Sequence, residues 1–191
     1  YACEGCGVCE LVCPVNAISL NEAVAGKLEL YKNCDVFSTA QLKMGSGTSG
    51  KLVSEVKKQL IKESISEFAV IDGSPGIGCP VIASLSGVDM VLIVAEPSIS
   101  GISDMERIIK SAERFGLKIA ICINKYDTNT EITNKIEAYC NDNGIMIVGK
   151  IPFDKKAVEA VNNNVSIVDI DCVSGNAVKE VYRKTMSIFL N

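Results

Sequence analysis

The sequence predicts an α/β protein, in which a mostly parallel, doubly wound sheet follows a small cysteine-rich module. Two observations predict the sheet. Short apolar runs alternate with longer amphipathic segments, and the runs are continuous in Val and Ile, as in parallel strands buried on both faces. The third observation, four cysteines within the first 13 residues, sets the module apart. The chain has 191 residues, and we expect the module at 1–35 and the α/β domain at 36–191.

The apolar runs place the elements in order. We expect buried strands at 68–72, 89–95, 118–123 and 145–148. Helices fit at 49–64, 101–115, 129–142, 154–163 and 175–189. Within the module we expect a hairpin of 17–20 with 27–31, followed by a connector at 36–48. The last helix is apolar enough to suggest a membrane surface, but packing on the sheet is the favoured interpretation.

Composition excludes several functions. The net charge is −4, which argues against a nucleic-acid partner. The chain has no His, so Ser-His-Asp and Cys-His catalysis and His-ligated zinc are excluded. Nine cysteines, five of them scattered, fit a reducing cytoplasm better than a disulfide scaffold. No apolar run reaches the length of about 18 residues that would suggest a transmembrane span.

The four clustered cysteines have the spacing C-x2-C-x2-C-x3-C-P: Cys3, Cys6, Cys9 and Cys13. This is the bacterial ferredoxin motif for a [4Fe–4S] cluster, whereas zinc sites favour two separated pairs. In two-cluster ferredoxins the fourth cysteine of such a run ligates the other cluster. Two arrangements stay open. Either a second run precedes Tyr1, which we favour, or Cys34 or Cys13 completes a single cluster.

A second candidate site follows the first expected strand. Asp72 ends that strand and opens a Pro-Gly-x-Gly loop that contains Gly76. The carboxyl end of a parallel strand is where open α/β sheets bind ligands, and a carboxylate there can hold Mg²⁺. The alternative is an Asp that caps a turn before a helix. Just beyond, Cys79 is interpreted as a buried structural thiol, like Cys122 inside its apolar run.

Two further motifs bear on nucleotide binding. Asn124-Lys125-Tyr126-Asp127 ends a strand and matches the Asn-Lys-x-Asp loop that reads the base in many P-loop GTPases, although Asn and Asp are also common in turns. Gly45-x4-Gly50-Lys51 matches the front of a Walker A motif, but an ordinary glycine-rich helix start explains it better. Glu96-Pro97-Ser98 ends another strand at the same edge, and a turn explains it almost as well.

Together these motifs resemble the MinD/Mrp-type P-loop ATPases of the SIMIBI class, in the branch that carries an inserted two-[4Fe–4S] ferredoxin domain. The resemblance runs in order through nearly the whole chain. It is carried by the cysteine run and by residues 49–53, 71–80, 95–101, 124–127 and 151–154.

The resemblance implies roles for several residues. Asp72 would be the Walker B magnesium carboxylate and Gly76 would lie in switch II. Asn124 and Pro152 would touch the base. ATP, Mg²⁺ and a nucleotide-dependent homodimer are implied, as is a cluster role for Cys79 by similarity to the nitrogenase iron protein.

The sequence departs from this family in one respect. The deviant Walker A, Lys-Gly-Gly-x-Gly-Lys-Thr, lies before the inserted ferredoxin in the family, and this sequence has none. We therefore expect the chain to be the C-terminal portion of such a protein, without its first strand. On its own it should bind nucleotide poorly and not hydrolyse it.

The favoured function is an ATP-dependent iron–sulfur protein that couples nucleotide binding and hydrolysis to electron transfer toward a redox partner protein. One alternative is a carrier that delivers clusters to apo-proteins. A second is a ferredoxin-type electron carrier on a nucleotide-free fold.

Overall fold

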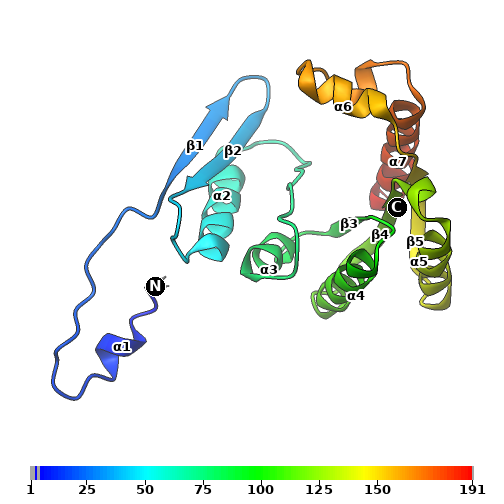
Figure 1. Cartoon of the computed structure of the whole chain (residues 1–191). Helices are drawn as coiled ribbons and strands as arrows, with labels where there is room; N and C mark the ends of the chain where they lie inside the picture. Colours follow the sequence, from blue (N-terminus) through cyan, green and yellow to red (C-terminus); the bar gives the residue numbers. More distant parts are fainter. Residues whose placement is uncertain (1–2, 4, 191) are drawn as a thin grey trace. The chain divides into compact units, whose positions relative to one another are not determined.

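The computed structural model describes residues 3 and 5–190, and it divides the chain into two compact units, Tyr1–Ser86 and Gly87–Asn191 (Figure 1). The second unit holds the parallel sheet. Its strands are β3 (Met90–Ala95), β4 (Lys118–Asn124) and β5 (Met146–Ile151), hydrogen-bonded in the order β3-β4-β5. The helices of this unit are α4 (Ile99–Arg114), α5 (Thr130–Asp142), α6 (Lys155–Asn162) and α7 (Val173–Leu190), with 3-10 turns η1 (Tyr126–Thr128) and η2 (Ile167–Asp169).

The central strand carries the core. Four consecutive side chains of β4, those of residues 120–123, are 0% exposed. Ile121 and Ile123 pack with buried side chains of α4 and α5 on one face, and Ala120 and Cys122 pack with Val181 of α7 on the other. Helices therefore cover both faces, which confirms the doubly wound parallel sheet. The packing of α7 on the sheet is confirmed as well.

The outer strand β3 is less buried than the sequence predicts. Ile93 and Ala95 lie in the core, but Val94 is 56% exposed. Among the described strands of this sheet, only β4 has neighbours on both sides and helices on both faces, so only β4 is covered along its length. The continuous apolar runs thus located β3, β4 and β5 correctly, and overstated the burial of β3.

Three helices of the second unit begin at polar caps that follow a strand. The Ser98 side chain accepts a hydrogen bond from Gly101 N at the start of α4, and Asn129 accepts one from Ile132 N at the start of α5. Asp154 accepts one from Lys156 N at the start of α6. Caps of this kind satisfy amide groups that the first helical turn leaves unpaired. They also fix the loops at the carboxyl edge of the sheet.

The described part of the first unit contains a two-stranded antiparallel ribbon, one longer helix and two short ones. Strand β1 (Gly26–Lys32) pairs with β2 (Val36–Leu42), and α2 (Ser49–Glu63) packs against β2. The remaining helices are α1 (Val8–Leu11) and α3 (Cys79–Leu85). Lys57 of α2 donates hydrogen bonds to the carbonyl oxygens of Ala83 and Ser84, each 3.0 Å away, and so ties α2 to the end of α3.

The expected hairpin of 17–20 with 27–31 is wrong. The expected connector at 36–48 is wrong over 36–42, which form β2, and confirmed over 43–48, which lead to α2. Residues 27–31 do form a strand, but their partner is β2, and the turn lies at 33–35. The polar side chains of β2 argued against a strand buried on both faces. That argument does not apply to a ribbon with one face against α2 and the other exposed, which tolerates alternating polar residues. The expected boundary between 35 and 36 falls in this turn.

The expected buried strand at 68–72 is also absent from this described segment. These residues form no strand, and Val70 is 77% exposed. An apolar run becomes a buried strand only where neighbouring strands supply hydrogen bonds and helices supply cover. The described parallel sheet begins at β3.

Within the described residues, no helix combines the length and the apolar composition needed to cross a bilayer.

Replacing the central core residue should destabilise the sheet. Ile121→Ala removes a side chain that is 0% exposed, so we expect a loss of about 2–5 kcal/mol in the free energy of unfolding. The matched control Ile99→Ala changes a side chain that is 82% exposed and should cost less than about 0.5 kcal/mol. Urea unfolding followed by circular dichroism measures both, and equal losses would contradict the assigned core.

Candidate functional site

The cysteine motif lies on a tightly turning loop. Gly5 and Gly7 both have left-handed backbone angles, with φ of 64° and 78°, and Cys9 lies in α1. Glycine adopts these angles without the steric penalty of a side chain. Of the motif cysteines, Cys3, Cys6 and Cys9 are exposed and Cys13 is half-buried.

Backbone amides point at two of the sulfur atoms. Gly5 N lies 3.4 Å from Cys3 Sγ, and Ala17 N lies 3.2 Å from Cys13 Sγ. The backbone N–H groups of Val15 and Ala17 lower the pKa of the Cys13 thiol, because they stabilise the thiolate. Thiolate is the form that ligates iron, and hydrogen bonds to sulfur tune cluster potentials.

Among the described residues, no three metal-ligating side chains lie close enough together to hold one metal ion, in this loop or elsewhere. The fit to a cluster therefore rests on the donor set, which consists of four thiols at ferredoxin spacing with amide donors at two of them.

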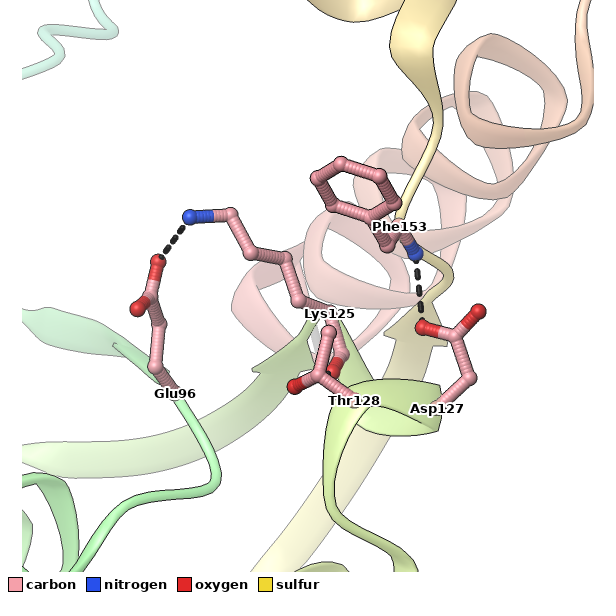
Figure 2. A network of polar contacts seen from close by, with 5 residues as sticks. All are labelled: Glu96, Lys125, Asp127, Thr128 and Phe153. Carbon is pink, nitrogen blue, oxygen red and sulfur yellow. Dashed lines mark hydrogen bonds and ion pairs between the residues drawn. The ribbon is translucent and has the colours of Figure 1, made fainter.

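The second candidate site lies at the carboxyl edge of the parallel sheet (Figure 2). Asn124 is the last residue of β4, and Lys125 turns the chain with a φ of 53°. Lys125 Nζ lies 2.7 Å from Oε1 of Glu96, the residue that follows β3. Asp127 Oδ1 accepts a hydrogen bond of 2.7 Å from the backbone N–H of Phe153, just after β5. The structure thus brings the Asn124–Asp127 motif to the loop that contains Pro152.

A hollow of about 500 Å³ lies beside this loop. Its lining residues are Pro152, Phe153, Asp154, Lys156, Asp171, Cys172, Val173 and Asn176. The backbone N–H of Lys156, and then the N–H and hydroxyl of Ser174, lower the pKa of Asp154, so this wall carries a fixed negative charge. The hollow is open to solvent, and half of its lining residues are charged or carry an amide.

Asp72 and Gly76 belong to the other unit. They lie in the segment between α2 and α3, where Asp72 is exposed and Gly76 has a φ of 84°. A left-handed glycine of this kind allows the chain to turn tightly. The magnesium and switch roles of these residues remain predictions.

The expectation of a buried Cys79 is wrong, because this thiol is exposed at the start of α3. Its Cβ lies close to the start of α2: a side chain at Gly50 would come within 3.0 Å of it. Glycine at position 50 therefore has a packing reason, in agreement with the ordinary helix start. Cys122 is buried as predicted, and burial raises its pKa to about 11.

Sequence reasoning missed the two contacts that define the sheet edge. The pair of Glu96 with Lys125 was accessible in principle, because opposite charges after neighbouring parallel strands meet at one edge. The bond of Asp127 with Phe153 had no sequence signal, since its donor is a backbone group.

Comparison with known proteins agrees with both the cysteine motif and the α/β fold. Residues 1–19 match the family model "4Fe-4S binding domain". An uncharacterized protein of Methanocaldococcus jannaschii is 31% identical over 145 residues, which cover 75% of this chain and 48% of the relative. An iron-sulfur cluster carrier protein of the same organism is 24% identical, over 71% of this chain and 52% of its own length. The chain thus spans about half the length of these curated relatives.

Among solved structures, the septum site-determining protein MinD of Pyrococcus horikoshii OT3, complexed with Mg-ADP, superposes with a TM-score of 0.57. It is 20% identical and the match covers 69% of this chain and 54% of that protein. The fold is therefore that of the MinD-type P-loop proteins. The chain joins this fold to an N-terminal 4Fe–4S binding segment, as the resemblance implied.

Alkylation should separate the cysteines by burial. At pH 8 we expect iodoacetamide to modify the exposed Cys34 and Cys79 of the native protein quickly. Cys122 should react at least roughly a hundredfold more slowly, because it is buried and its raised pKa leaves little thiolate. Peptide mass spectrometry measures the rates, with the urea-unfolded protein as control. Slow labelling of Cys79 would contradict its exposure.

Proposed function

We propose that this protein is an ATP-dependent iron–sulfur protein, in which nucleotide binding and hydrolysis are coupled to electron transfer through [4Fe–4S] clusters. The observation that carries the proposal is the presence of a ferredoxin cysteine motif and a MinD-like sheet in one chain. Neither part alone suggests coupling. A ferredoxin needs no nucleotide fold, and a P-loop switch needs no cluster.

The cysteine loop would hold the cluster, with Cys3, Cys6, Cys9 and Cys13 as thiolate ligands. A [4Fe–4S] cluster supplies one-electron chemistry when it is bound. The amides at Cys3 and Cys13 support this role, because N–H groups directed at sulfur stabilise its negative charge.

The nucleotide would lie at the carboxyl edge of the sheet. We assign its base end to Asn124, Asp127 and Pro152. The hydrogen bond from the Phe153 N–H to Asp127 supports this assignment, because it joins the loop after β4 to the loop that contains Pro152. From the family resemblance alone, we assign Mg²⁺ to Asp72, as the catalytic carboxylate, and the response to the γ-phosphate to the loop around Gly76. The MinD structure with Mg-ADP supports adenine nucleotide and magnesium as the ligands of this fold.

This function implies partners and a compartment. We propose a redox protein as the electron donor or acceptor, and a homodimer that closes on nucleotide, as the family resemblance implies. We place the protein in the reducing cytoplasm, where Cys122, Cys140 and Cys172 persist as free thiols.

A second candidate has support of its own. The match to an iron-sulfur cluster carrier favours a protein that delivers its cluster to an apo-acceptor. Anaerobic incubation of the loaded protein with an apo-ferredoxin separates the two functions. A cargo cluster moves to the acceptor, whereas a redox cluster stays and cycles between oxidation states.

Cluster ligation should depend on the motif cysteines. In the whole gene product we expect about eight irons per chain, and Cys6→Ser should remove about four of them with the matching EPR signal. The control Cys34→Ser should keep all of the iron. Anaerobic iron and sulfide analysis measures this. Four stable irons in the parent protein, without ATP turnover, would favour the simple electron carrier.

ATP turnover should depend on Asp72. Asp72→Ala in the whole gene product should lower kcat for ATP roughly a hundredfold, because the magnesium ion loses its carboxylate. The control Asp142→Ala, at the exposed end of α5, should leave kcat unchanged. A coupled phosphate-release assay with and without reductant measures both. Absence of turnover in the parent protein would overturn the proposal.

A further inference from the structure

We propose that Lys57 is a positioning residue that fastens α3 to α2, so that a movement of the loop at 73–78 reaches the β1–β2 ribbon that follows the cysteine motif. This inference rests on the proposed function and adds the contacts through which nucleotide and cluster would affect each other. The contacts that carry it all lie within the first unit, Tyr1–Ser86.

The ammonium group of Lys57 is held by the end of α3. Its Nζ donates to the carbonyl oxygens of Ala83 and Ser84, each 3.0 Å away, and to that of Ser86, the C-cap of the helix. The last carbonyl groups of a helix have no partner within the helix and carry partial negative charge, which suits a cation. Partial burial lowers the pKa of Lys57, so these bonds offset a desolvation cost. Lys57 therefore fastens the end of α3 to the middle of α2.

The starts of the two helices are also in close contact. A Cβ at Gly50 would lie 3.0 Å from the Cβ of Cys79 and 3.2 Å from its carbonyl oxygen. Gly50 and Lys57 lie about two helical turns apart, as do Cys79 and Ser86. The helices therefore run side by side in the same direction, and α3 is held against α2 at both of its ends.

The loop at 73–78 leads directly into α3. Gly78 is the N-cap of the helix, and its carbonyl oxygen accepts a hydrogen bond from Val81 N at 3.0 Å. Within α3, Val81 and Leu85 are buried, and α2 is the main described neighbour of this helix. A displacement of the loop should therefore move α3, and α3 should carry α2 with it as long as Lys57 holds the two helices together.

Helix α2 is attached to the ribbon at the same turn. Ser38 Oγ of β2 lies 3.0 Å from the carbonyl oxygen of Val56, the residue that precedes Lys57. At the end of α2, Glu63 pairs with Lys32 of β1. Because one turn of α2 contacts β2 through Val56 and α3 through Lys57, the helix links these two elements.

The ribbon follows the cysteine motif along the chain. Residues 14–25 join Cys13 to β1, and the Ala25 carbonyl oxygen accepts hydrogen bonds from Lys43 N at 2.8 Å and from Ser46 Oγ at 3.3 Å. The segment that leaves the motif is thus bonded to the segment that leads into α2. Movement of α2 would reach Cys13 through this segment.

Hydrogen exchange in the absence of nucleotide tests whether Lys57 fastens α3. Lys57→Met keeps an apolar stem but removes the three donated bonds, so the amides of 79–86 should exchange with D₂O at least about tenfold faster than in the parent. Lys57→Arg keeps the charge and the donors and should stay within about threefold of the parent. Lys58→Met, at a side chain that is 71% exposed, is the matched control and should leave the exchange unchanged. Mass spectrometry of peptic peptides measures all three variants.

Equal exchange in Lys57→Met and in the parent overturns the fastening. If Lys57→Met does not fold, Lys57→Gln takes its place, because it also removes the charge and leaves a polar side chain at this half-buried position. Its shorter side chain cannot reach the same three carbonyl oxygens, so it should again speed the exchange of 79–86.

The ATP affinity of the cluster-loaded whole gene product tests the transmission. In the parent we expect reduction of the cluster with dithionite to change ATP affinity about fivefold or more. In Lys57→Met this ratio should fall below about twofold, while ATP affinity in the oxidised state stays within about threefold of the parent. Lys57→Arg and Lys58→Met should keep the ratio. Anaerobic titration with a fluorescent ATP analogue measures the affinities.

The outcomes separate this inference from the proposed function. A lysine that only stabilised α3 would speed the exchange without changing the affinity ratio, so a ratio present in the parent and unchanged in Lys57→Met overturns the inference alone. A parent protein that binds no ATP, or binds it equally in both oxidation states, overturns the proposed function together with the transmission. The exchange of 79–86 then still decides whether Lys57 fastens α3.

Discussion

The second unit depends on one constraint, which is that β4 is buried on both faces. Residues 120–123 expose no side-chain surface, so helices must cover the strand above and below and neighbouring strands must hydrogen-bond along both of its edges. Helices α4 and α5 meet the first requirement on one face, and α7 meets it on the other. Strands β3 and β5 meet the second, both parallel to β4.

The same constraint creates the candidate nucleotide site. Because the strands are parallel, the loops that follow them all lie at the carboxyl edge of the sheet. No described neighbouring strand covers the polar side chains of these loops. At this edge Lys125 pairs with Glu96 after β3, and Asp127 accepts a hydrogen bond from the Phe153 N–H after β5. Asn124 ends the most buried strand. The buried strand β4 fixes the position of the Asn124 amide at this edge. A fixed amide suits a ligand that must be recognised in one orientation.

The cysteines lie in two main kinds of environment. Those of the motif lie on an exposed loop, where backbone amides at sulfur favour the thiolate. Cys122 lies in the core, where burial favours the neutral thiol and removes its reactivity. Cys79 resembles neither group, since it is exposed at a helix start and packed close to Gly50. Exposure and neighbours, rather than the number of cysteines, therefore divide the nine thiols by chemistry.

The sequence by itself determined what depends on local pattern. The spacing of the motif cysteines, the apolar run of β4 and the position of Asn124 each indicated a structure that local chemistry enforces. Tertiary structure decided what depends on partners distant in sequence. The pairing of β1 with β2, the missing strand at 68–72 and the bond of Asp127 to the Phe153 backbone all depend on which segments meet. Backbone donors and strand neighbours leave no mark in residue type, so only the folded chain could reveal them.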